Sequence, residues 1–184
     1  MAFKDVLRAR MAAYFLRREK EPARKKKGAN FSTADSVAII AVDTDEQAFK
    51  KLRKYVQHLR TEHQIKNVVV FSFINGNEKD VPVYHAHKLE YDYFTFDDLT
   101  WNLKPGQAIK NFILRDFDIL IDATHSEYYP LRYVLINSVA RMKVGRTGHA
   151  ASKFLDLSLD VPTTSSFDEF MSQADHYLSK FSFK

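Results

Sequence analysis

The first 28 residues combine an apolar stripe with a high density of positive charge. Over residues 3–19, apolar side chains recur at three- and four-residue steps, which predicts an amphipathic helix. The members of this stripe are Phe3, Val6, Leu7, Met11, Tyr14 and Phe15. Pro22 ends the pattern, and the like-charge run Arg-Lys-Lys-Lys at 24–27 predicts a solvated linker. We therefore expect a basic helix and linker over 1–28, followed by one domain over 29–184.

After residue 35, short apolar runs rich in β-branched residues alternate with longer segments. The runs at 36–42, 67–74 and 117–123 are nearly continuous, as in strands that are buried on both faces of a parallel sheet. Shorter runs at 142–144 and 154–159 predict two more strands. Residues 83–89 alternate only in part, which predicts an edge strand.

Helical periodicity separates these runs, at 45–62, 106–115, 127–140 and 166–181. Asp43 and Asp45 offer capping chemistry for the first of these helices, and Ser126 offers it for the third. Strands that alternate with helices pair in parallel, with right-handed crossovers. The sequence therefore predicts a Rossmann-like α/β fold, a three-layer sandwich around a mostly parallel sheet of about five to six strands.

Composition narrows the setting of the protein. The chain has no cysteine among its 184 residues, which excludes disulfides, thiolate catalysis and Cys-based metal sites and favours a cytoplasmic location. No apolar run is long enough to cross a bilayer. The net charge of +5 is uneven, because residues 1–28 carry ten Lys or Arg against three Asp or Glu, whereas the rest carries 18 against 20. The body is therefore not expected to bind nucleic acid.

The basic N-terminal helix is compatible with several roles. It can dock in the groove of a partner protein, lie on an anionic membrane surface or bind RNA. Alternatively, its apolar stripe packs on the domain and its charges are solvated. The sequence leaves these roles open, and it is also compatible with a homo-oligomer.

Polar side chains gather where three of the predicted strands end, and ligands of open parallel sheets bind beyond the carboxyl ends of the strands. The candidate ligand-binding residues are Asp43, Thr44, Asp122, Thr124, His125, Ser126 and Arg146. A helix start near Thr124 and Ser126, beside Arg146, would suit an anion or a phosphate. His125 and Glu127 could exchange protons as acid and base. The same residue types also cap helices at strand–helix junctions, so a purely structural role stays open.

Several signatures of known sites are absent. No Gly-x-Gly-x-x-Gly follows the first strand, and neither a P-loop nor a Gly-x-Ser-x-Gly elbow occurs, so no cofactor is expected. His85 and His87 would share one face of an edge strand, but no third ligand stands nearby, and we favour a partly exposed structural pair. His58 and His63 fall on different helix faces and are expected at the surface. No metal site is predicted.

The run Phe-Asp-Ile-Leu-Ile-Asp at 117–122, then a helix, then Ser-Val-Ala-Arg-Met-Lys-Val-Gly at 138–145, resembles an uncharacterised family of small bacterial proteins with a Rossmann-like core. This resemblance spans 36–180 and implies the fold but no activity. Over about thirty residues, the same stretch is similar to the N-terminal half of heptosyltransferase-type GT-B glycosyltransferases. Those enzymes bind their nucleotide-sugar donor mainly in a second Rossmann domain, for which this chain is too short. No catalytic residue is therefore carried over.

Two classes of function remain open at this point. The first is a non-catalytic binding or interaction module whose basic helix contacts a partner or a membrane surface. The second is a small enzyme, or the remnant of one, that binds a nucleotide or a nucleotide-sugar-like ligand at the carboxyl edge of the sheet. A ligand trapped at the carboxyl edge of the sheet would favour the second, and a helix found detached or domain-swapped would favour the first.

Overall fold

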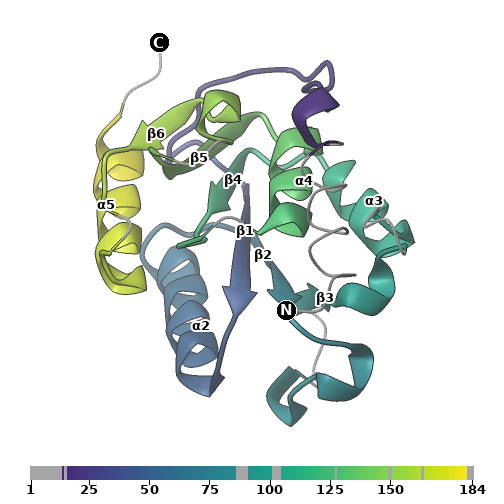
Figure 1. The fold of residues 1–184 in the computed structure, drawn as a ribbon. Helices are drawn as coiled ribbons and strands as arrows, with labels where there is room; N and C mark the ends of the chain where they lie inside the picture. Colours follow the sequence, from purple (N-terminus) through teal and green to yellow (C-terminus); the bar gives the residue numbers. More distant parts are fainter. Residues whose placement is uncertain are drawn as a thin grey trace.

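The computed structural model describes residues 14, 16–85, 91–100, 105–126, 128–148, 151–162 and 164–181. Most of the N-terminal helix predicted over 3–19 therefore lies outside the described residues. The described part forms an α/β fold around one sheet (Figure 1).

Six parallel strands make up the sheet, in the order β3-β2-β1-β4-β5-β6. They are β1 (Ser36–Asp43), β2 (Asn67–Ile74), β3 (Tyr91–Phe94), β4 (Ile119–Asp122), β5 (Met142–Arg146) and β6 (Leu157–Leu159). This is the strand order of the Rossmann fold. The prediction of a Rossmann-like parallel sheet of about six strands is confirmed.

In the described part of the chain, the helices α2 to α5 cover the two faces of the sheet. They are α2 (Glu46–Thr61), α3 (Gln107–Ile113), α4 (Tyr129–Asn137) and α5 (Phe167–Lys180). Most buried side chains of α2 and all those of α5 belong to one hydrophobic cluster, whereas most of those of α3 and α4 belong to the other, on the opposite face (Figure 1). The successive residues of β1 alternate between these two clusters, which explains the continuous apolar run that marks the strand in the sequence.

The expected edge strand over 83–89 is wrong for residues 83–85, and its remainder lies outside the described residues. Val83–His85 forms a 3₁₀ turn, and the edge strand is instead β3. The reason lies in the aromatic packing of Phe94, which is buried and stacks on Phe71 of β2 at 4.8 Å between ring centroids. The proposed cap at Ser126 is also wrong, because α4 begins after Tyr128, with Pro130 in its first turn.

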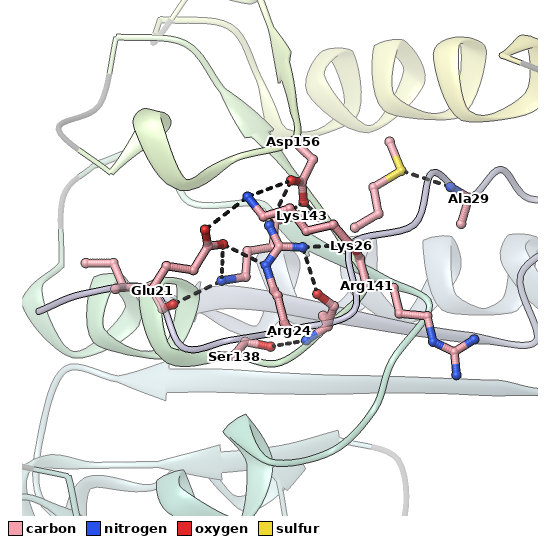
Figure 2. Close-up of polar contacts among 11 residues, drawn as sticks. Glu21, Arg24, Lys26, Ala29, Ser138, Arg141, Lys143 and Asp156 are labelled. Atoms are coloured by element: carbon pink, nitrogen blue, oxygen red, sulfur yellow. Dashed lines mark hydrogen bonds and ion pairs between the residues drawn. The ribbon is translucent and has the colours of Figure 1, made fainter. Parts of the chain in front are cut away.

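One arginine helps to hold the segment that precedes β1 against the sheet. The side chain of Arg24 has no exposed surface, and its Nε donates to Glu21 Oε1 at 2.6 Å. Its Nη2 donates to both oxygens of Asp156, at 2.8 and 2.7 Å, and its Nη1 donates to the carbonyls of Ala140 and Arg141 at 3.1 and 2.8 Å. Figure 2 shows the guanidinium between these groups. The expectation of a wholly solvated linker over 24–27 is therefore wrong for Arg24, although the three lysines after it are exposed.

A second buried cation joins the same cluster (Figure 2). Lys143 of β5 is fully buried, and its Nζ donates to Glu21 Oε1 at 3.3 Å and to the carbonyl of Ile136 at 3.0 Å. Burial and the like charge of Arg24 lower the pKa of Lys143 to about 8, although Glu21 opposes this shift. Burial alone would raise the pKa of Glu21, but its hydrogen bonds from Arg24 and Lys26 and the charge of Lys143 outweigh that effect and lower it to about 2.

Glu21 thus forms ion pairs with two buried cations, Arg24 and Lys143, and these contacts join residues 21–24 to β5. The boundary expected after residue 28 stays a prediction. The contacts of Arg24 nevertheless place that residue with the body of the protein rather than with a separate arm.

We predict that Glu21→Gln lowers the free energy of unfolding by about 1–3 kcal/mol at pH 7, because two buried cations then share fewer carboxylates. The pKa of Glu21 lies below its ordinary value of 4.5 in the folded protein, so its contribution is present above pH 4.5 and is lost as the pH falls towards 2. The difference between wild type and variant should therefore shrink in urea titrations from pH 7 to pH 3.

The matched control is Glu46→Gln, which removes an exposed helix pair with Lys50 and should cost less than about 0.5 kcal/mol. Equal effects of the two substitutions at pH 7 would contradict the role assigned to Glu21.

Candidate functional site

The point where the chain changes direction across the sheet lies between β1 and β4. From β1 the chain passes through α2 to β2 on one side, and from β4 it passes through α4 to β5 on the other side. Such a switch point leaves a crevice beyond the carboxyl ends of the two strands. Here that crevice is a pocket of about 260 Å³. Its walls come from the end of β1, the loop after β4, the first turns of α2, and Tyr128 and Phe167.

The pocket brings together five of the seven residues that the sequence nominated. These are Asp43, Thr44, Thr124, His125 and Ser126. The carboxyl ends of adjacent parallel strands meet at one edge, so their polar side chains gather there although they are far apart in sequence. The two remaining residues, Asp122 and Arg146, do not line the pocket wall.

Asp45 closes the amino end of α2, which borders the pocket. Its Oδ1 accepts hydrogen bonds from the backbone N–H groups of Gln47 and Ala48, at 2.8 and 2.9 Å. The hydrogen bond from Ala48 lowers the pKa of Asp45, so the carboxylate is ionised at neutral pH. In nucleotide-binding folds, the free amides of the corresponding helix receive a phosphate. In this protein a negative charge from the chain itself occupies that place.

Asp43 is held in a buried pair at the end of β1. One of its oxygens, Oδ2, is hydrogen-bonded to His85 Nε2, and the other accepts from the Tyr84 hydroxyl at 3.3 Å. His85 is 1% exposed and packs on Phe49, with 4.6 Å between ring centroids. Burial and the negative charge of Asp43 raise the pKa of Tyr84 to about 12. The expected partly exposed pair of His85 and His87 is wrong for His85, and His87 lies outside the described residues.

Arg146 is a buried structural cation rather than a free anion ligand. Its guanidinium lies over the ring of Phe170, 4.2 Å from the centroid, and its Nη1 donates to the carbonyl of Pro162 at 3.1 Å. Its Nη2 lies 3.4 Å from His125 Nδ1. Burial lowers the pKa of Arg146, and the nearby charge of Asp122 opposes that shift. Arg146 therefore touches the pocket only through His125.

Two residues that contact the pocket-lining Asp43 were not predicted as site residues from the sequence. Tyr84 and His85 come from the turn Val83–His85 and reach the end of β1 across the sheet edge. No local pattern signals this contact, because the partners are separated by more than 40 positions. The proposed proton exchange between His125 and Glu127 stays a prediction, since Glu127 lies outside the described residues.

The strand order and the switch-point pocket define an α/β protein of the Rossmann type. A family model described as "Family of unknown function (DUF6913)" matches residues 8–181, so the chain belongs to this family. The resemblance to an uncharacterised family is thereby confirmed, whereas nothing in the comparisons supports the resemblance to glycosyltransferases. No curated protein and no solved structure matches the chain. Among the described residues, no helix is both long enough and apolar enough to span a membrane.

The cap at α2 yields a direct prediction. Asp45→Ala should lower the free energy of unfolding by about 1 kcal/mol, because two backbone N–H groups lose their acceptor. Asp45→Asn should change stability little, since asparagine also caps helices, but it removes the negative charge from the pocket rim. Phosphate should then raise the melting temperature of the Asn variant more than that of the wild type.

Sodium chloride at the same ionic strength separates phosphate binding from general screening. An equal response of wild type and Asp45→Asn to phosphate would contradict the role of the carboxylate.

Proposed function

We propose that this protein is a non-catalytic binding module that holds a small polar ligand in the pocket between β1 and β4. The observation that carries the proposal is the pocket itself, which lies at the switch point and is bordered by an ionised carboxylate, Asp45. The ligand that fits this chemistry bears hydroxyl or amine groups towards Asp45 and has no phosphate there.

The lining of the pocket supports a small polyol or amine. Side-chain hydroxyls come from Thr44, Thr124, Ser126 and Tyr128, and apolar surface comes from Phe49, Leu52 and Phe167. Hydroxyl groups both donate and accept, so they suit ligands with several hydroxyls. Apolar rings beside a few polar groups are typical of small-molecule pockets. The volume of about 260 Å³ limits the ligand to a compact molecule, such as a monosaccharide or part of a nucleoside.

The charge distribution argues against a phosphate at the helix terminus. Asp45 already satisfies the N–H groups of Gln47 and Ala48, and Lys51, the cation among the pocket-lining residues, forms an ion pair with Asp168 at 2.8 Å. A phosphate on these amides would have to displace a carboxylate and then lie close to it. Like charges at this distance repel each other.

The buried histidine argues against acid–base catalysis. In a catalytic dyad, the aspartate orients the imidazole and the other ring nitrogen faces the substrate. Asp43 and His85 have the first of these features. His85 Nδ1, however, is buried and has no hydrogen-bond partner among the described residues. The pair therefore serves to fix the turn Val83–His85 against the end of β1.

A nucleotide or nucleotide-sugar-like ligand is the second candidate, and the Rossmann strand order favours it. In that case the base or the sugar would lie in the pocket, and the phosphates would point away from Asp45. We also keep as proposals a cytoplasmic location and a protein or membrane contact through residues 1–28. The absence of cysteine supports the location, and the basic charge of that segment supports the contact.

Matched pairs of ligands test the proposal. Saturation-transfer NMR on the full chain compares the affinities of hexoses with those of hexose phosphates. It likewise compares nucleosides with their 5′-phosphates. We expect the unphosphorylated member to bind more tightly in each pair. Thr124→Val and Ser126→Ala should each lower the affinity for the ligand that binds by about fivefold, which corresponds to the loss of one hydrogen bond.

Ser172→Ala, on the exposed side of α5 and outside the pocket, is the control and should leave the affinity unchanged. Tighter binding of the phosphorylated members, or affinities that are indifferent to Thr124 and Ser126, would overturn the proposal.

A further inference from the structure

Two histidines and one aspartate converge at the other end of α2. His58 belongs to the last turns of α2, His63 follows its end, and Asp175 lies in the middle of α5. His58 Nε2 is 3.0 Å from Asp175 Oδ1, and His63 Nε2 is 2.8 Å from the same oxygen. The three potential ligand atoms all lie within 4.8 Å of one another. The expectation that His58 and His63 lie apart on the surface is therefore wrong.

The fold explains why these residues meet. Both α2 and α5 bury their apolar faces in the same cluster on one side of the sheet, so their outer edges run side by side (Figure 1). After α2 the chain reverses at Gln64, whose φ is +56°. This left-handed conformation is uncommon for a residue other than glycine. His63 lies just before this reversal, two residues beyond the end of α2, where its ring packs on Phe31 at 4.5 Å and lies at 89° to the ring of His58.

We propose that His58, His63 and Asp175 form a binding site for a divalent transition metal, with Zn²⁺ as the preferred ion. Two imidazole nitrogens and one carboxylate are ligands that zinc and non-haem iron share. Ligand bonds of about 2.0–2.1 Å place the ligand atoms of a tetrahedral ion roughly 3.3 Å apart, so small movements of these side chains suffice. The remaining positions of the ion are left to water.

The surroundings of the cluster suit an ion. The side chains of His63 and Asp175 are 17% and 25% exposed and that of His58 is 40% exposed, so the site is partly screened and still open to an ion from solution. Tyr55, one turn before His58, has a buried hydroxyl without a hydrogen-bond partner among the described residues. A tyrosine hydroxyl can donate one hydrogen bond, so this buried group lacks an acceptor in the described part of the chain. A metal-bound water or the second oxygen of Asp175 would give it an acceptor.

The site is separate from the ligand pocket. The pocket borders the first residues of α2, and the histidines lie at its last turn and beyond. A helix of 16 residues is roughly 24 Å long, so an ion here would not touch the pocket ligand. It would instead tie the end of α2 and the loop before β2 to α5. The metal site therefore stands or falls independently of the proposed binding function.

Metal titration of the tag-free full chain tests the site. We expect Zn²⁺ to bind at one equivalent in isothermal calorimetry, and Co²⁺ to give the visible absorption of a site with imidazole ligands. Excess chelator should reverse both effects. At a free Zn²⁺ concentration 100-fold above its Kd, the melting temperature should rise by about 5–10 °C.

Nitrogen-detected NMR of the histidine rings identifies the ligands in the wild-type chain, so this result does not depend on a folded variant. Zn²⁺ should remove the Nε2 protons of His58 and His63 and leave His176 unchanged. His176 is the neighbour of Asp175 on α5, is exposed and lies outside the cluster.

Variants give the second test. Asp175→Asn and His63→Gln should each weaken Zn²⁺ binding at least tenfold, because each substitution removes one of the three protein ligands. His176→Gln is the matched control and should bind as the wild type does. A wild-type chain that binds no Zn²⁺ or Co²⁺, or one whose binding depends on His176 and not on His63, would overturn the proposal.

Discussion

The position of β1 between β2 and β4 is the constraint on which the rest of the structure depends. Its side chains alternate between the two hydrophobic clusters, with Val37 and Ile39 on one face and Ala38 and Ile40 on the other, and all four are fully buried. A strand whose side chains are buried in both clusters can carry polar residues only at its ends, where the sheet reaches solvent. The apolar run of β1 therefore ends at Asp43, and this end of the strand lines the pocket. Packing and ligand binding are linked through this one strand.

The sequence predicted those parts of the fold that depend on local periodicity. Continuous apolar runs revealed β1, β2 and β4, because strands that are buried on both faces need apolar residues at every position. The edge strand β3 was missed because Tyr91–Phe94 is half polar and gains its place from Phe94 packing on β2. For the site, the rule that parallel strands end at one edge predicted five of the residues in the pocket wall. The same rule wrongly placed Arg146 in the pocket wall, because its guanidinium instead packs on the ring of Phe170.

Contacts between distant polar groups could not be predicted from the sequence. Arg24 looks like one member of a charged run, and only the folded chain shows that it differs from the three lysines beside it. His85 and His63 likewise have unremarkable neighbours in sequence. His85 lies in a 3₁₀ turn and His63 lies just before the chain reversal at Gln64, and each meets a carboxylate from another element. Buried polar groups need partners, and the identity of a partner is a property of the tertiary structure.

The two ends of the sheet have a consequence for self-association. Strands at a sheet edge present unpaired backbone groups, and a long exposed edge invites a second chain to extend the sheet. Here the edges are β3 with four residues and β6 with three, and β3 carries a charged residue, Asp92, in its middle. Edges this short offer few backbone hydrogen bonds to a neighbour. The lengths of β3 and β6 therefore disfavour continuation of the six-stranded sheet into a second chain.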